Sequence, residues 1–206
     1  MNHITKVAVF TVVCLISSTA MAVTSNASYT LYPPDRDLGD LNHYRNYTWG
    51  MDTPWDTSPD ENNEYEQVIE ATLSFNQIRN WDDNPNVLYI HLLDQARRGV
   101  SVNYDGQRGG DYFDGEGPEL ITYVNLPSTS QNLTYTFDQD ELDTLNDYAY
   151  DGRFGLGLDP DCHFYNCGVQ LDVVTEMGTG PVVPEPATIT LLLAGGLAVI
   201  RRKRRK

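Results

Sequence analysis

The sequence predicts an all-β protein, an antiparallel β-sandwich or jelly roll with one short helix. Seven or eight short segments alternate apolar and polar side chains, which is the pattern of half-buried strands. Clusters of Asp, Asn, Gly and Pro separate these segments, and only one stretch has the apolar spacing of a helix. We assign the sandwich to residues 23–177 of the 206-residue chain, a length that suits one domain with a single core.

Residues 1–22 have the pattern of a secretory signal peptide. A positive charge at Lys6 precedes the apolar residues 7–16, and Ala20-Met21-Ala22 is the small-x-small pattern that signal peptidase recognises. The alternative is an N-terminal membrane anchor. This ten-residue segment, apolar apart from Thr11, makes a helix of about 15 Å, which is short against about 30 Å of hydrocarbon. We therefore expect export and cleavage after Ala22.

The expected strands begin after residue 66, because residues 23–66 are polar and aromatic without a clear period. That first part should form loops with one or two edge strands. The next strand should place Ile69, Ala71, Leu73 and Phe75 on one face. Further strands are expected at residues 88–92, 100–102, 121–126, 133–137, 154–158 and 169–174.

The expected helix covers residues 140–148. Leu142, Leu145 and Ala149 fall at helical spacing, and Gly152 suits the end of a helix. Residues 178–186 then read as a stalk that follows the sandwich.

The charge of the chain is strongly acidic between its two ends. From residue 7 to residue 200 there are seven arginines and no lysine, against all 29 acidic side chains. Such a field excludes nucleic acid and anionic lipid as partners, and it favours divalent cations or cationic polymers. The alternative is that the acidic surface only keeps the protein dispersed.

The densest group of metal-type ligands lies in residues 158–168. Asp159, Asp161 and Asn166 offer hard oxygen donors for Ca²⁺, although the glycine and the twelfth-position Glu of an EF-hand are missing. The alternative is that these side chains form ordinary Asx turns. Two other candidate groups are Asp82, Asp83, Asn84 and Asn86, and Asp105, Asp111, Asp114 and Glu116.

Two cysteines remain after removal of the signal peptide, which contains Cys14. In an oxidising compartment we expect a disulfide between Cys162 and Cys167, with free thiols or metal ligation as the alternatives. His163 invites a zinc interpretation, but its spacing from the two cysteines matches no zinc motif. His91 lies on an expected strand and should be a hydrogen-bonded sheet residue rather than a catalytic base.

Aromatic side chains in loops provide surfaces that stack on sugar rings. The residues of this kind are Tyr44, Tyr47, Trp49, Trp55, Tyr65 and Trp81. We take Trp49 and Trp55 as the candidate glycan contacts. The alternative is that Trp49 and Trp81 are buried in the core.

No arrangement of catalytic residues stands out. No Asp/Glu pair is distinguished among the 29 acids, and there is no Gly-x-Ser-x-Gly motif. We expect a non-enzymatic protein, with a small glycan hydrolase or lyase as the alternative.

The C-terminus combines three ordered features: Pro184-Glu185-Pro186, the apolar residues 187–200 and the basic residues 201–206. If helical, the apolar segment would reach about 21 Å and span a membrane only marginally. The basic cluster should stay on the cytoplasmic side and leave everything before Pro184 outside. This combination resembles the PEP-CTERM sorting signal.

The PEP-CTERM resemblance implies an address rather than an activity. It implies cleavage near the motif by an exosortase, after transient anchoring in the inner membrane, and release or re-anchoring outside a Gram-negative bacterium that makes exopolysaccharide. We therefore expect a protein of the outer surface or extracellular matrix, associated with exopolysaccharide.

Overall fold

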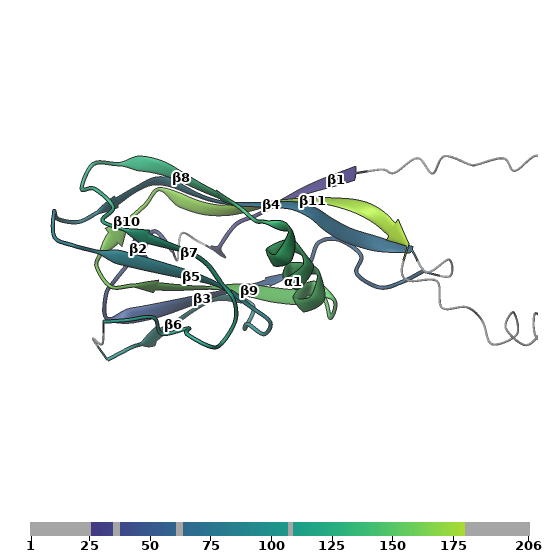
Figure 1. Cartoon of the computed structure of the whole chain (residues 1–206), viewed down its shortest axis with the longest axis horizontal. Helices are drawn as coiled ribbons and strands as arrows, with labels where there is room; N and C mark the ends of the chain where they lie inside the picture. Colours follow the sequence, from purple (N-terminus) through teal and green to yellow (C-terminus); the bar gives the residue numbers. More distant parts are fainter. Residues whose placement is uncertain (1–25, 35–37, 61–63, 107–108, 180–206) are drawn as a thin grey trace, which may run out of the picture.

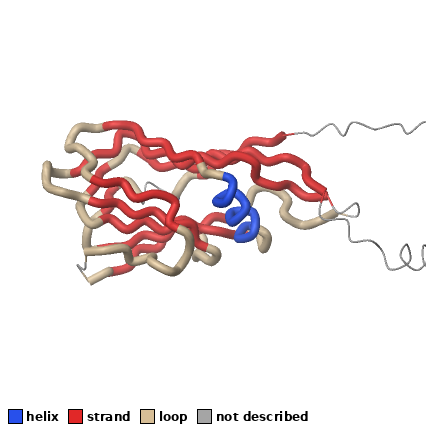
Figure 2. Tube along the Cα trace, in the orientation of Figure 1, coloured by secondary structure: helices blue, strands red, loops and turns tan. Residues whose placement is uncertain are grey.

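The computed structural model describes residues 26–34, 38–60, 64–106 and 109–179, which form eleven strands and one helix. The strands make two antiparallel sheets that lie face to face (Figures 1 and 2). The all-β prediction is confirmed, with one short helix. The signal peptide, the Pro-Glu-Pro motif, the apolar residues 187–200 and the basic tail lie outside the described residues. Within the described part, no helix is long and apolar enough to cross a membrane.

The larger sheet has six strands in the order β1-β11-β4-β10-β2, and β8 also pairs with β4. Its strands are β1 (Asn26–Leu31), β2 (Asp40–Leu41), β4 (Glu64–Asn80), β8 (Gln131–Thr136), β10 (Phe164–Tyr165) and β11 (Gly168–Thr179). β4 is the long member of this sheet, and its 17 residues span about 50 Å at the usual rise of a strand.

The smaller sheet has five strands in the order β6-β3-β9-β5-β7. Its strands are β3 (Arg45–Asp52), β5 (Val87–Leu93), β6 (Gly99–Tyr104), β7 (Glu119–Val124) and β9 (Arg153–Pro160). β3 corrects the expectation of loops and edge strands before residue 66, because it lies between β6 and β9. Tyr47, Trp49 and Met51 alternate along it and are buried. Only these three of the eight residues of β3 have apolar side chains, so the alternation covers a short stretch of the sequence.

The core fills the space between the two sheets. On β4, Ala71, Leu73 and Phe75 are buried as expected, but Ile69 is not among the buried residues, and Val68 is. The pairing with β11 shifts at this point, from Glu70 opposite Val174 to Val68 opposite Thr175. This β-bulge gives β4 one extra residue and changes which side chains face the core.

Helix α1 (Gln139–Ala149) connects β8 of one sheet to β9 of the other, and it confirms the helix expected at residues 140–148. It begins with a capping box, in which Asp138 accepts from the Glu141 backbone and Glu141 accepts from the Asp138 backbone. Leu142, Leu145 and Ala149 are buried, also as expected. The helix therefore covers one side of the space between the sheets (Figure 1).

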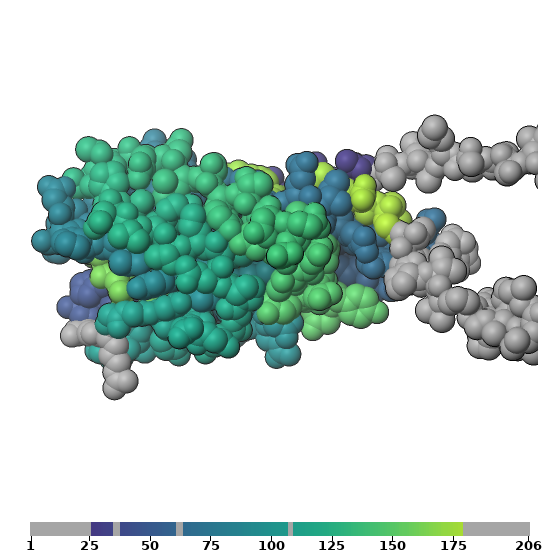
Figure 3. Space-filling model, in the orientation of Figure 1, coloured from purple at the N-terminus to yellow at the C-terminus, as the bar shows by residue number. Residues whose placement is uncertain are grey.

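The two ends of the described chain lie together. Asn26 of β1 pairs with Glu176 of β11, and Thr179 pairs with Glu64, the first residue of β4. In Figure 3 the purple start and the yellow end of the chain accordingly emerge at the same end of the body. We call this the terminal end, and the opposite end, where β4 meets β10, the tip.

Candidate functional site

Two regions of the described chain bring polar or aromatic groups together. The first is the outer face of β5 and β9, on the side away from the core. Tyr89 pairs with Asp159 and His91 pairs with Gly157, so the side chains of these pairs share one face. Residues 109–118 fold across this face, and we call the region the loop-covered face.

Glycine allows the loop to lie directly on the sheet. A Cβ atom built on Gly157 would come within 2.9 Å of the Phe113 ring. Phe113 is 2 % exposed, so the ring and the strand form a closed contact. A side chain at this position of β9 would hold the loop away.

Aspartates of β9 and of the turn that follows it anchor the loop through its backbone. The N–H of Gly110 donates to Asp161 Oδ2 at 3.0 Å, and the N–H of Tyr112 donates to Asp159 Oδ2 at 2.8 Å. Asp111, between them, accepts from the Phe113 N–H at 2.9 Å through its Oδ1. The loop is therefore fixed at successive residues.

Asp159 is the most perturbed acid of the loop-covered face. It is 1 % exposed, and burial raises the pKa of its carboxyl to about 6, with a smaller opposing effect from the Tyr112 hydrogen bond. The nearby charges of Asp161, Asp105 and Asp111 raise this pKa further. Its second oxygen, Oδ1, is buried and has no hydrogen-bond partner within the described residues. Burial raises the pKa of the Asp161 carboxyl too, as do the nearby charges of Asp105 and Asp111, while the hydrogen bond from the Gly110 N–H lowers it.

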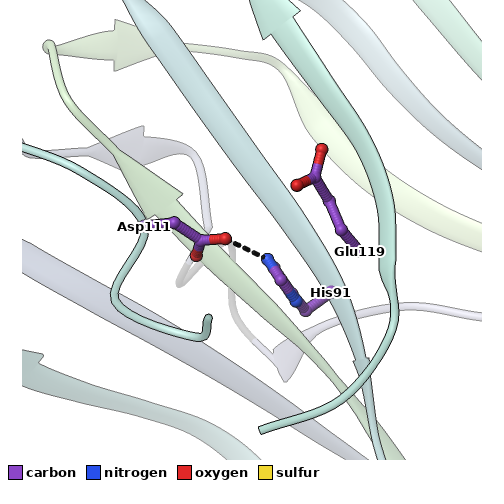
Figure 4. A group of neighbouring side chains, drawn as sticks. All are labelled: His91, Asp111 and Glu119. Carbon is purple, nitrogen blue, oxygen red and sulfur yellow. Dashed lines mark hydrogen bonds and ion pairs between the residues drawn. The ribbon is translucent and has the colours of Figure 1, made fainter. Parts of the chain in front are cut away.

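Next to Asp159, three side chains from separate elements converge in Figure 4. His91 of β5, Asp111 of the loop and Glu119 of β7 have ligand atoms that all lie within 4.8 Å of one another. His91 Nε2 is 2.7 Å from Asp111 Oδ2, and His91 Nδ1 is 3.2 Å from the Gly117 carbonyl oxygen. Both ring nitrogens of the buried His91 thus have partners, as we expected of a sheet residue. Its grouping with Glu119 was not predictable, because it depends on the β5–β7 register.

The predicted Ca²⁺ ligands are only partly brought together. Asp159 and Asp161 act on the same loop, but the side chain of Asn166 donates to the Leu38 carbonyl and accepts from the Gly168 N–H. It hydrogen-bonds to a different part of the chain. Calcium binding stays a prediction, without Asn166 among the groups that hold the loop.

The other two candidate groups differ in outcome. Asp82 accepts from the Asn84 N–H at 3.0 Å, and Asn86 bridges to the backbone of Leu126. These hydrogen bonds stabilise a turn and a loop, as in the alternative interpretation that such side chains form Asx turns rather than a metal site. In the second group, of Asp105, Asp111, Asp114 and Glu116, Asp111 is part of the loop-covered face.

The expected disulfide is not formed, since Cys162 and Cys167 are both free. They lie before and after β10, which runs along β4: the His163 carbonyl accepts from Trp81, and the Cys167 N–H donates to Asn76. Cys162 is buried, whereas Cys167 is exposed and its Sγ contacts Gln77 Oε1 at 3.2 Å, so the two thiols have different surroundings.

The two tryptophans proposed as glycan contacts are in the core, which corrects that prediction. Trp49 is 1 % exposed and Trp55 is 4 % exposed. The ring of Trp55 lies 5.8 Å from Tyr29 and 6.0 Å from Phe154, centre to centre. Trp81, in contrast, is 58 % exposed.

Trp81 begins the second region, a row of rings at the tip in which Trp81 and Tyr165 are exposed and His163 is partly covered. The Trp81 and His163 rings are 6.1 Å apart, and the His163 and Tyr165 rings are 4.7 Å apart. The guanidinium carbon of Arg79 lies 5.6 Å from the centre of the Tyr165 ring, within the range of a cation–π contact. His163 Nε2 also hydrogen-bonds to Asp40. We call Trp81, His163 and Tyr165 the aromatic row.

The fold is an acidic antiparallel β-sandwich that presents the aromatic row at the tip, opposite the end where Asn26 and Thr179 lie. Residues 182–206 match the family model of the PEP-CTERM protein-sorting motif. This match confirms the resemblance, and it indicates an exported protein that is anchored in a membrane before an exosortase processes it.

Other comparisons add little. Among solved structures, a recombinantly expressed latent aurone synthase (polyphenol oxidase) is 11 % identical over 65 % of this chain, with a TM-score of 0.39. The match covers 25 % of that structure, and a likeness of this size carries no argument. No curated protein sequence matches the chain.

Proposed function

We propose that this chain is a non-enzymatic protein of the extracellular polysaccharide matrix, which binds exopolysaccharide through the aromatic row. The observation that carries the proposal is the PEP-CTERM motif at residues 182–206, which directs the chain to the outside of the cell. The matrix and glycan roles go beyond that motif and rest on the surface described above.

The aromatic row has the chemistry that recognises sugars. The exposed Trp81 ring can present a flat apolar face to the apolar side of a pyranose. Elsewhere in the row, Arg79 lies over Tyr165 and Asp40 is bonded to His163, and both carry hydrogen-bonding groups. The row lies at one end of β4, and Thr179, the last residue that the structure describes, pairs with Glu64 at the other end. A chain held by its C-terminus would therefore direct this surface away from its anchor.

Charge selects among polysaccharides. The many carboxylates of the exported part repel polymers rich in uronic acids, so the proposed ligand is neutral or carries amino sugars.

A co-sedimentation experiment tests the proposal on the mature protein purified after export, mixed with the exopolysaccharide of its own host. We expect the wild-type protein to sediment with the polymer without releasing reducing ends. Trp81→Ala should lose most of this binding, because stacking on a sugar ring depends on the flat face of the indole. Tyr150→Ala is the matched control, since Tyr150 is 62 % exposed and lies on α1's C-terminal side, away from the row.

Three results would contradict the proposal. They are failure of the wild-type protein to sediment, binding by Trp81→Ala that equals wild type, and loss of binding in Tyr32→Ala instead. The last result would place the glycan in a groove of about 490 Å³ that Tyr32 lines with Asn76 and Gln170.

A glycan hydrolase or lyase is the alternative, and the raised pKa of Asp159 is the observation that favours it. An acid with a pKa near 6 suits proton donation to a leaving group. Asp159 is 1 % exposed beneath the loop, however, so a glycosidic oxygen reaches it only if the loop opens. Release of reducing ends that disappears in Asp159→Asn would establish this alternative.

A further inference from the structure

We propose that His91, Asp111 and Glu119 form a binding site for a divalent transition-metal ion, of which Zn²⁺ is the best-matched example. The site would tie the loop at residues 109–118 to β5 and β7. This inference is independent of the aromatic row and of any glycan.

The three ligands come from three chain segments that already converge. Their ligand atoms lie within 4.8 Å of one another, and His91 Nε2 is 2.7 Å from Asp111 Oδ2. His91 and Glu119 are opposite each other on β5 and β7, so sheet pairing sets their spacing. Glu119 is exposed, and Thr122 donates a hydrogen bond to its Oε1, which leaves Oε2 as the oxygen that can ligate an ion.

The orientation of the His91 ring is suited to metal binding. Nδ1 faces the Gly117 carbonyl oxygen at 3.2 Å, and a carbonyl only accepts, so Nδ1 carries the hydrogen. On the other side of the ring, Nε2 and Asp111 Oδ2 are 2.7 Å apart and share a hydrogen (Figure 4), which a bound metal ion would replace, so that both atoms become ligands. Metal-binding histidines are commonly oriented in this way, with the other ring N–H donated to a backbone carbonyl.

The surroundings contain negative charge that is not fully compensated. The buried Oδ1 of Asp159 has no hydrogen-bond partner within the described residues. Asp159 shares the sheet face of His91, one pair further along β9 and β5. The β5–β7 register also shifts between Ile90 and His91, and such bulges often orient a side chain at a site.

The donor set selects the class of ion. One imidazole nitrogen and two carboxylate oxygens suit Zn²⁺ and its neighbours in the transition series, whereas Ca²⁺ and Mg²⁺ prefer oxygen ligands alone. Three protein ligands leave a coordination position for water.

Calorimetric titration of the chelator-treated mature protein with Zn²⁺ tests the site. We expect one saturable site per chain, with Ca²⁺ and Mg²⁺ at equal concentration failing to displace the ion. Glu119→Gln should weaken binding at least about tenfold, and Asp111→Asn should do so independently. Glu116→Gln, which changes an exposed acid of the same loop, is the matched control and should bind as wild type does.

Co²⁺ provides a second readout, because its visible absorption reports nitrogen and oxygen ligation directly. The bands of the wild-type protein should change in Glu119→Gln and stay unchanged in Glu116→Gln. The proposal is overturned if no saturable Zn²⁺ site exists. Equal affinity in Glu119→Gln and wild type, or displacement of Zn²⁺ by Ca²⁺, would overturn it as well.

Discussion

The ring of Phe113 lies directly on Gly157, where an added Cβ atom would be 2.9 Å from ring carbons. Both residues are buried, so the contact closes the loop onto the smaller sheet. Gly157→Ala should force Phe113 outward and cost about 1–3 kcal/mol of unfolding free energy, measured by urea denaturation.

Gly109→Ala is the control for this substitution. Its added Cβ would have Asp161 Oδ2 as its nearest neighbour, at an ordinary 3.8 Å, and we expect less than about 0.5 kcal/mol. Equal stability of Gly157→Ala and wild type would show that the loop does not rest on β9.

The alternation of apolar residues was sufficient to predict the strands and the helix that carry most of the core. Leu88, Ile90 and Leu92 are buried on β5, and Leu142 and Leu145 are buried on α1. Bulges and register were not predictable in the same way, because they depend on cross-strand pairing. Ile69 was therefore assigned to the wrong face.

The candidate site was predictable in its residue types and not in its geometry. Asp159, Asp161 and Asp111 were all identified as metal-type ligands from local composition. Their association follows from a loop that returns across β9, and the addition of Glu119 follows from pairing between β5 and β7. Trp49 is buried because its position on β3 faces the core, and Trp55, which follows β3, is buried beside Tyr29 and Phe154.

Asp159 gives the protein a pH dependence of known sign. Its folded pKa of about 6 lies above the ordinary value of 3.8, so the folded state binds this proton more tightly than the unfolded state does. Stability should fall as the pH rises from about 4 to about 6, by at most about 3 kcal/mol from this group. Asp159→Asn should remove that part of the slope.

The measurement is urea denaturation across this pH range in the presence of a chelator, which removes any effect of bound cations. Asp114→Asn is a suitable control because Asp114 is exposed. An identical slope for Asp159→Asn and wild type would contradict the assignment.

The two thiols should differ in reactivity. Cys167 is exposed and contacts Gln77 Oε1 at 3.2 Å, whereas Cys162 is buried in the core. Iodoacetamide should therefore modify Cys167 in the native protein and Cys162 only after unfolding, as followed by mass spectrometry without reductant. A denatured protein that takes up no label until it is reduced would instead establish the disulfide.

The Pro-Glu-Pro motif should control processing. Pro184 and Pro186 favour an extended backbone on either side of Glu185, which is a form that a processing enzyme can hold. Replacing all three residues with alanine should leave a full-length precursor in the membrane fraction of a host that has an exosortase. Pro181→Ala is the matched control, because Pro181 lies just outside the matched residues 182–206 and its loss should leave processing unchanged. The C-terminal mass and cell fraction of each variant decide the outcome: if the triple-alanine protein has the same mass and location as wild type, the motif is not the element that the exosortase requires.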